Sequence, residues 1–319
     1  MPVAECRPRC ELTLSSSMEK ISFFDQIEKN KKNSYFLIFF VFIVLIGLGF
    51  VFSQVFDPGA TFIILIFSII FSISYTVGTY YYSDKIALAS VGATPAVGEQ
   101  YSRLRNRVEG LSMAAGLPKP GVYVMHSPEI NAFATGRDPE HSVICVTDGA
   151  LQRLTEPELE GVLAHEMSHV ANYDIRFVTL AAVMVGIISI ASQLFLRSMW
   201  LGGGRSNDER RGGGGAIFLV IGIILAILAP IVVKLVQLAI SRRREYMADA
   251  GSVQLTRYPG NLISALKKIK AYYEGGAPHA KVSDAVAPMF FADPLHARFV
   301  NLFNTHPPIE DRIKVLEAM

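Results

Sequence analysis

Apolar residues along the chain are concentrated in four long runs. They extend over Tyr35–Phe56, Thr61–Tyr82, Phe177–Leu196 and Ala216–Ile240, and Lys234 in the last run is the only charged residue among them. Each run has at least the roughly 20 residues that a helix needs to cross the hydrocarbon core of a bilayer. A helix buried in a soluble core usually shows a run of about 10–14 apolar residues instead. The pattern therefore predicts four transmembrane helices.

The spacing of the runs divides the chain into alternating apolar and polar parts. Only residues 57–60 separate the first two runs, and a glycine-rich loop at 197–215 separates the last two, so each pair is expected to form a hairpin. The predicted parts are an N-terminal tail (1–34), a transmembrane hairpin (35–82), a first polar segment (83–176), a second transmembrane hairpin (177–240) and a second polar segment (241–319). Within the tail, residues 1–17 are expected to be unstructured, and Met18 is an alternative start.

Basic residues flank the runs on one side of the predicted membrane. Lys29, Lys31 and Lys32 precede the first run, and Arg242–Arg244 follow the last. Because Lys and Arg in short flanking segments remain on the cytoplasmic side, both polar segments are predicted to face the cytoplasm. Four arginines in the 197–215 loop oppose this orientation.

The polar segments show the helix and strand patterns of a small α+β domain. Apolar residues of Glu99–Ala115 recur at helical spacing, whereas Val122–Met125 and Val143–Val146 are short β-branched runs that predict strands. Thr155 and Glu158 have the spacing of a capping box at the start of a further helix. The predicted fold is mainly helical, with four transmembrane helices and an α+β domain built from two segments.

The helix that begins after Thr155 carries the sequence His165-Glu166-Met167-Ser168-His169. Residues i and i+4 lie on one face of a helix, so both imidazoles can reach one metal ion while Glu166 reaches water beside it. The spacing predicts His165 and His169 as metal ligands and Glu166 as the general base of a hydrolytic reaction. Two ordinary buried histidines are the alternative.

A site of this kind needs a third protein ligand, and Glu245 is the best candidate. It follows His169 by 76 residues, of which 64 belong to the second predicted hairpin, and that hairpin returns the chain to the same membrane face. Asp249, one helical turn later, is expected to accept a hydrogen bond from a ligand histidine, His165. Ion pairs with Arg242–Arg244 are the alternative for both carboxylates. The residue that stabilises an oxyanion stays open among His126, His141, His279, His296 and His306.

Composition and charge narrow the class of protein. Charged residues make up 18% of the chain and apolar residues 51%, which excludes a disordered chain, since disorder requires low hydrophobicity and high net charge. A formal net charge of +2 without a basic stripe gives no reason to expect nucleic-acid binding. Three cysteines do not form a disulfide framework for a chain of 319 residues.

The motifs together resemble a known group of proteases. Glu245 and Asp249, with the two histidines and Glu166, resemble the gluzincin metallopeptidases. With the four apolar runs, the segments Asn131–Gly136, Ser241–Tyr246 and Thr305–Pro308 resemble the HtpX-like membrane zinc metalloproteases of peptidase family M48, over about residues 20–319. The resemblance implies one Zn²⁺ per chain and polypeptide substrates, above all misfolded or damaged membrane proteins. It also implies a multi-pass protein in the lipid bilayer of a bacterial inner membrane, with the active site facing the cytoplasm.

The resemblance further implies which residues border the substrate cleft. They are Asn131, Ala132, Phe133 and Gly136, on an expected edge strand, and His306 and Arg312 in a C-terminal motif. Simpler alternatives are a turn at 131–136 and an ordinary surface charge at Arg312. His306 could likewise only mark the entry into a helix at Ile309–Leu316.

Two other functions remain open at the level of sequence. A peptidase of the same chemistry could process one specific peptide, such as a prenylated CAAX C-terminus. A non-catalytic membrane metal-binding protein is the third reading, although Lys234 is the only charged residue within the predicted spans and transporters usually carry more ionisable groups there.

Overall fold

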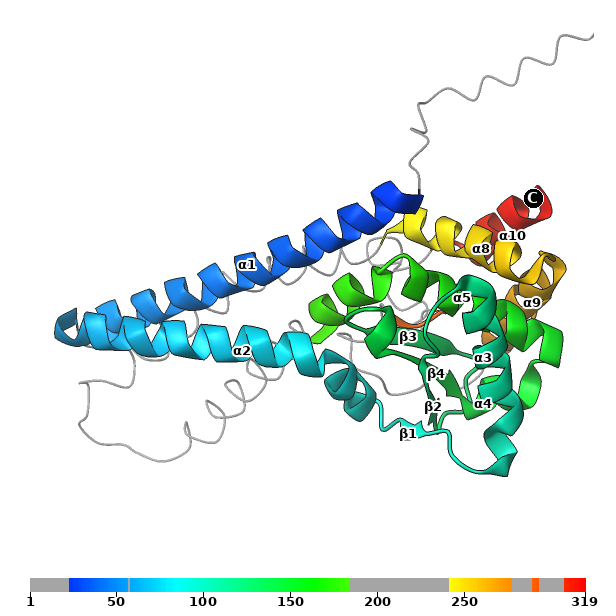
Figure 1. Ribbon diagram of the computed structural model, residues 1–319, viewed down its shortest axis with the longest axis horizontal. Coiled ribbons are helices and arrows are strands. Elements are labelled where there is room, and N and C mark those ends of the chain that lie inside the picture. The colour runs from blue at the N-terminus through cyan, green and yellow to red at the C-terminus, as the bar shows by residue number, and fades with distance from the viewer. Residues whose placement is uncertain (1–22, 57, 184–240, 277–288, 293–306) are drawn as a thin grey trace, which may run out of the picture.

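The computed structural model describes residues 23–56, 58–183, 241–276, 289–292 and 307–319. Two long helices, α1 (Phe23–Phe56) and α2 (Thr61–Ser90), project together from a body of helices and strands (Figure 1). The short 3₁₀ helix η1 (Pro58–Ala60) lies between them in the chain. The first predicted hairpin is therefore formed by two helices.

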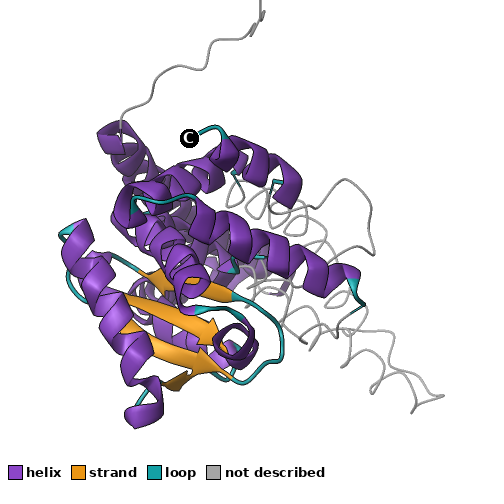
Figure 2. Cartoon of the chain, turned by 90° about the vertical axis from the view of Figure 1, so that its right-hand side faces the viewer, coloured by secondary structure: helices purple, strands orange, loops and turns teal. Residues whose placement is uncertain are grey.

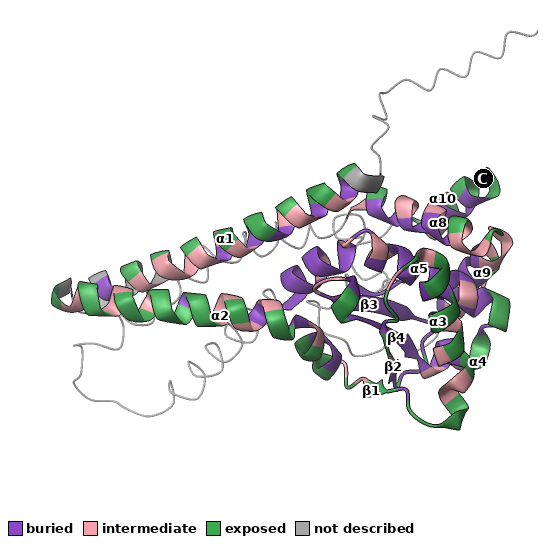
Figure 3. Cartoon of the chain, viewed as in Figure 1, coloured by how far each residue is buried: buried purple, intermediate pink, exposed green. Residues whose placement is uncertain are grey.

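These two helices expose apolar side chains over most of their length. Asp25–Gly47 and Thr61–Ser90 are long and apolar enough to cross a membrane, and only 22% and 6% of their most apolar stretches are buried within the protein. Figure 3 shows exposed residues along both helices, among them Phe36, Phe67 and Phe71. Such a surface is unfavourable in water and favourable against lipid.

The last two predicted spans fall almost wholly outside the described residues. Residues 177–183 are described and helical. Phe177, Leu180 and Ala181 pack there against Leu37 and Val41 of α1. The start of the third apolar run thus contacts α1.

Part of the predicted N-terminal tail, residues 1–34, is helical. α1 begins at Phe23, well before the apolar run starts at Tyr35. Gln26, Asn30 and Ser34 recur at a spacing of four residues and are buried. The apolar run marks only the part of the helix that lipid can cover, whereas this polar stripe packs against protein.

The sheet has four strands in the order β1-β2-β4-β3. These are β1 (Thr94–Pro95), β2 (Gly121–Met125), β3 (Ala132–Gly136) and β4 (Ser142–Thr147). β2 and β4 are parallel, whereas β1 and β3 pair antiparallel with their neighbours. The two strands predicted from β-branched runs are confirmed, and β3 is an edge strand rather than the turn considered as its alternative.

Both faces of the sheet are covered (Figure 2). Ile144 and Val146 of β4 face the main core, which includes Leu163 of helix α5 (Glu156–Ala171). Val143 and Cys145, on the opposite face, belong to a second cluster with the C-terminal end of α2. This alternation is the period-2 pattern of a strand buried on both sides.

Helix α5 lies at the centre of the body and joins the two polar segments. The described residues also form the helices η2 (Glu99–Tyr101), α3 (Ser102–Ala115), η3 (Pro139–His141), α4 (Asp148–Arg153), α8 (Arg242–Thr256), α9 (Gly260–Glu274) and α10 (Ile309–Glu317). A Cβ atom at Gly251 of α8 would collide with the Ser168 hydroxyl oxygen, and one at Gly161 would lie 2.8 Å from the backbone nitrogen of Leu262. These two glycines therefore let α8 and α9 approach α5 closely.

Candidate metal centre

Helix α5 places both histidines of the HExxH motif on one face. Its start is fixed by the predicted capping box, in which Thr155 and Glu158 satisfy each other's backbone N–H groups. From this start, His165 and His169 are one turn apart, and their Nε2 atoms lie 3.1 Å from each other. The motif thus presents two imidazole nitrogens at one point in space.

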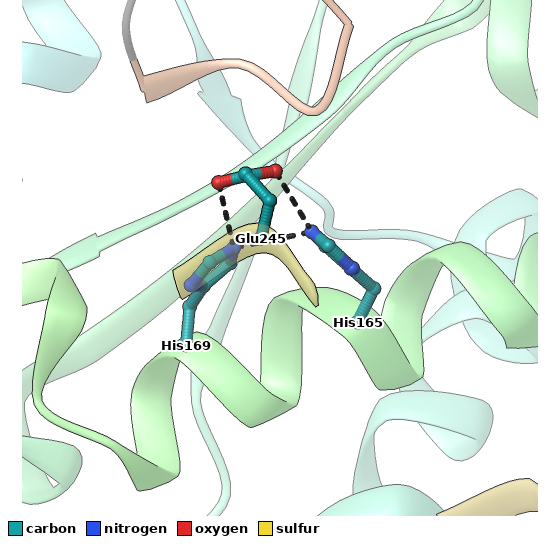
Figure 4. A group of neighbouring side chains, drawn as sticks. All are labelled: His165, His169 and Glu245. Carbon is teal, nitrogen blue, oxygen red and sulfur yellow. Dashed lines mark hydrogen bonds and ion pairs between the residues drawn. The ribbon is translucent and has the colours of Figure 1, made fainter. Parts of the chain in front are cut away.

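Glu245 reaches the same point from α8 (Figure 4). Its Oε2 lies 3.7 Å from Nε2 of His165, and its Oε1 lies 3.7 Å from Nε2 of His169. The three residues offer ligand atoms that all lie within 4.8 Å of one another. The residues that the sequence analysis proposed as ligands therefore come together from two distant segments.

The other ring nitrogen of each histidine is held by a carboxylate. Nδ1 of His165 lies 2.9 Å from Oδ1 of Asp249, and Nδ1 of His169 lies 2.9 Å from Oδ2 of Asp174. A proton on each Nδ1 leaves the lone pair on Nε2, where a metal ion would bind. Asp249 lies where the sequence analysis expected it, whereas Asp174 was not anticipated.

The donor set fits a zinc ion. Two ligands held at about 2.0–2.1 Å from a tetrahedral zinc are about 3.3 Å apart, close to the 3.1 Å between the Nε2 atoms. Two imidazoles and one carboxylate are also a common protein ligand set of catalytic zinc. Little rearrangement is needed for the three side chains to hold a metal ion.

Burial and neighbouring charges shift the ionisation of His169 and Asp249 in the protein without metal. Burial alone would lower the pKa of His169, but Asp174 and Glu245 raise it to about 9. Burial alone would raise the pKa of Asp249, but Arg312 and His165 outweigh this effect and hold the pKa below its ordinary value. The site thus keeps Asp249 ionised and opposite His165.

Glu166 is buried beside the two histidines. Burial raises the pKa of its carboxyl group, and the nearby histidines oppose this shift. The backbone N–H of Ala134 in β3 donates a hydrogen bond to the carboxylate. A carboxylate with a raised pKa is better matched to proton transfer near neutral pH.

Arg312 is a structural part of the centre and not a surface charge. Only 1% of its surface is exposed. Its Nε lies 2.9 Å from Oδ2 of Asp249, and one of its terminal nitrogens lies 2.6 Å from Oδ1. This fork places α10 against the carboxylate that holds His165, so the alternative reading of Arg312 is wrong.

Asn131 and the expected cleft residues of β3, which begins directly after it, are buried. The Asn131 side chain makes two hydrogen bonds to the backbone of Ala292. The ring of Phe133 packs on that of Phe290, with centroids 4.9 Å apart. Ala132 accepts a hydrogen bond from the backbone N–H of Phe291. Residues 289–292 thus cover part of the outer edge of β3.

The last of these β3 residues, Gly136, ends the strand. Its φ of 139° is strained for any residue with a side chain, and a Cβ atom there would collide with the backbone oxygen of His141. Its backbone N–H lies 3.4 Å from the hydroxyl of Thr179. The backbone conformation and close packing at this position therefore require glycine, whether or not Gly136 contacts substrate.

Several histidines were candidates for a further role at the site. His126 pairs with Asp148, and His141 pairs with Asp138, both at exposed positions. His279, His296 and His306 lie outside the described residues. The oxyanion partner is therefore not assigned among them.

Sequence reasoning missed two neighbours of the ligands. Asp174 lies five residues after His169, beyond a turn. A carboxylate so soon after the HExxH motif was the one sequence feature that could have indicated a partner for His169. The ring of Phe291 packs edge-on against His165, with centroids 4.8 Å apart. No local sequence pattern pointed to this aromatic residue, because a long segment separates it from the motif.

Comparison with known proteins gives a consistent family. The model of peptidase family M48 matches residues 99–319. A protease HtpX homolog of Caldanaerobacter subterraneus is 46% identical over 303 residues, which cover 95% of this chain and 99% of the relative. A protease HtpX homolog of Dictyoglomus thermophilum is 42% identical over 302 residues, which cover 95% and 96%.

A solved structure, that of S. mikatae Ste24p, is also similar. It is 20% identical with a TM-score of 0.44, and the match covers 91% of this chain and 66% of that protein. A likeness at this level supports no argument about activity. The family match and the relatives establish that the chain belongs to peptidase family M48 and is a membrane metalloprotease.

Proposed function

We propose that the chain is a gluzincin-type, zinc-dependent endopeptidase that cleaves misfolded or damaged membrane proteins at the cytoplasmic face of a bacterial inner membrane. The observation that carries the proposal is the convergence of His165, His169 and Glu245 beside the buried Glu166. The HtpX relatives and the apolar surface of α1 and α2 support the membrane setting. Basic residues at the ends of the apolar runs support the cytoplasmic orientation.

The residues of the chain have distinct roles in this proposal. His165, His169 and Glu245 would hold one Zn²⁺, which supplies a Lewis acid for peptide hydrolysis. Glu166 takes a proton from the attacking water and passes it to the leaving amine. Asp249 and Asp174 keep the two imidazoles in the required tautomer and orientation.

The substrate is proposed to bind as an extended peptide near β3. This strand is at the edge of the sheet, and Phe290 and Phe291 pair with that edge at Ala132 and Phe133. Addition of a strand gives backbone hydrogen bonds that do not depend on sequence. Such binding suits an enzyme that acts on many unfolded segments.

Replacement of the general base tests the proposal. The Glu166→Gln variant of the full chain in detergent should cleave an unfolded protein at least about 10²-fold more slowly. It should still bind Zn²⁺, since the three ligands are unchanged. Rate and bound metal are measured together on the same preparation. Glu160→Gln, on the partly exposed side of α5, is the matched control and should cleave normally.

Two outcomes would contradict the proposal. Equal cleavage by Glu166→Gln and the unmutated protein would exclude Glu166 as the base. Binding of metal without cleavage of any unfolded protein would favour a non-catalytic metal protein. A farnesylated peptide offered in parallel distinguishes the specific processing enzyme, which should prefer that peptide.

A further inference from the structure

The first turns of α1 lie against the back of the metal centre. In Figure 1 the start of α1 lies beside the start of α8, which carries Glu245. Asn30, in the part of the chain expected to be a tail, has only 1% of its surface exposed. A polar side chain is stable at such a position only if its hydrogen bonds are made.

Asn30 makes those hydrogen bonds to residues that follow the HExxH helix. Its side-chain nitrogen donates to Oδ1 of Asp174 over 2.6 Å and to the backbone oxygen of Asn172 over 2.9 Å. Its side-chain oxygen accepts from the amide of Gln26, one turn earlier, over 3.3 Å. The amide orientation of Asn30 is thus fixed from both ends.

Asp174 connects Asn30 to a proposed metal ligand. One carboxylate oxygen, Oδ1, accepts the hydrogen bond from Asn30, while the other, Oδ2, lies 2.9 Å from Nδ1 of His169. The guanidinium of Arg244 lies 3.8 Å from Oδ1, beyond hydrogen-bond distance. A change in the position of this carboxylate would therefore move the imidazole.

The turn that carries Asp174 is not favoured locally. Tyr173 has a φ of 58°, a left-handed conformation that is uncommon for residues other than glycine. The ring of Tyr173 lies under the ammonium group of Lys31, 4.2 Å away, and 5.1 Å from the guanidinium of Arg176. Residues 30 and 31 of α1 therefore contact all three residues of the turn.

We propose that Asn30 of the first membrane helix is a positioning residue of the metal centre, which acts through Asp174 to orient His169. The inference rests on the proposed metal site. It gives α1 a role beyond anchoring, because the protease body cannot complete the environment of His169 without this helix. Residues outside a ligand set that orient its histidines commonly affect metal affinity about 10–100-fold.

Zinc affinity of the full-length chain in detergent tests the inference. The metal is removed, and Zn²⁺ is returned in competition with a chromophoric chelator. Asn30→Ala should weaken the affinity by on the order of tenfold, since it acts one hydrogen bond beyond Asp174. Lys32→Gln, an exposed change on the same helix, is the matched control and should leave the affinity unchanged.

A double-mutant cycle separates this role from general packing. If Asn30 acts through Asp174, adding Asn30→Ala to Asp174→Ala should change the affinity by less than about twofold. Asn30→Asp is a second variant of nearly the same shape. When its carboxyl group is ionised, it still accepts from Gln26 but cannot donate to Asp174, so it should then weaken zinc binding even if Asn30→Ala folds poorly.

The possible results are distinct. The inference would be overturned, while the metal site stands, if both Asn30 variants bound Zn²⁺ with unchanged affinity. It would also be overturned if Asn30→Ala weakened zinc binding as much in the Asp174→Ala background as in the otherwise unmutated chain. Failure of the unmutated chain to bind Zn²⁺ would overturn the proposed function and the inference with it. The expected result is that Asn30→Ala weakens zinc binding in the otherwise unmutated chain but has no further effect in the Asp174→Ala background. This result would support the proposed metal site and the role of Asn30.

Discussion

At the scale of residues, the carboxylate of Asp249 contacts both His165 and Arg312. Oδ1 of Asp249 lies 2.9 Å from Nδ1 of His165 and 2.6 Å from a guanidinium nitrogen of Arg312. Isolated buried charges are very costly, so each of these groups depends on the others. The orientation of His165 is therefore tied to the C-terminal helix α10, which is remote in sequence.

Arg312→Lys tests this dependence. Lysine keeps the charge but loses the planar fork that contacts both oxygens of Asp249. We expect the free energy of unfolding to fall by about 1–3 kcal/mol, less than when one partner of a buried pair is removed altogether, and zinc affinity to fall with it. Denaturation and zinc titration of the purified chain measure both. Lys314→Gln, exposed on the same helix, is the control; equal stability of the two variants would contradict the expectation.

At the scale of elements, the start of α5 joins three parts of the body. Glu158 accepts hydrogen bonds from the backbone N–H of Thr155, the hydroxyl of Ser264 and the ammonium group of Lys268, over 2.6–2.7 Å. Burial alone would raise the pKa of Glu158, but Lys268, Ser264 and Thr155 lower it to about 2. The capping residue Glu158 thus also holds α9 against the start of α5.

Glu158→Gln should destabilise the protein in a pH-dependent way. The pKa is depressed on folding, so the ionised group stabilises the fold above pH 4.5, and this contribution is lost as the pH falls toward 2. At pH 7 we expect a loss of about 1–2 kcal/mol from the weakened cap and contacts. The difference from the unmutated protein should shrink between pH 4.5 and pH 2 in thermal unfolding. Glu317→Gln, in an exposed ion pair, is the control, and a difference constant with pH would refute the assignment to Glu158.

Elements with strong local signals were predictable. The helix at 99–115 appears as η2 and α3 and ends at Gly116, whose φ is 66°. The capping box at Thr155 is present. In contrast, β1 has two residues, and the first turns of α1 are polar. Short or polar elements carry little periodicity, so their structure depends on what they pack against.

At the scale of the whole molecule, the catalytic body is assembled from chain segments on either side of the second apolar pair. α8 and α9 follow residues 184–240 and pack on α5, which precedes them. The end of α2 covers the sheet face opposite α5. The C-terminal end of α2 therefore packs directly on the sheet of the protease body.

The proposed orientation predicts how the folded protein reacts with a membrane-impermeant maleimide. Met113 of α3 is 72% exposed, whereas Cys145 is buried. With Cys6 and Cys10 replaced by serine, the Met113→Cys variant should react in inverted vesicles but not in spheroplasts, because the proposed orientation places the body in the cytoplasm. Reaction after detergent treatment controls for accessibility. Labelling in spheroplasts would show that the body faces the opposite side of the membrane.

The sequence alone determined the ligand helix and the candidate third ligand. HExxH is a local pattern whose meaning depends only on helical spacing, and the removal of one predicted hairpin brought Glu245 near it. Apart from Asp249, the partners of these residues were decided by tertiary structure alone. Phe291 and Asn30 reach the centre through contacts between segments far apart in the chain, and Asp174 reaches it through the turn after α5. No local periodicity encodes such contacts. The physical reason is that backbone geometry sets spacing within an element, whereas packing between elements decides which side chains meet.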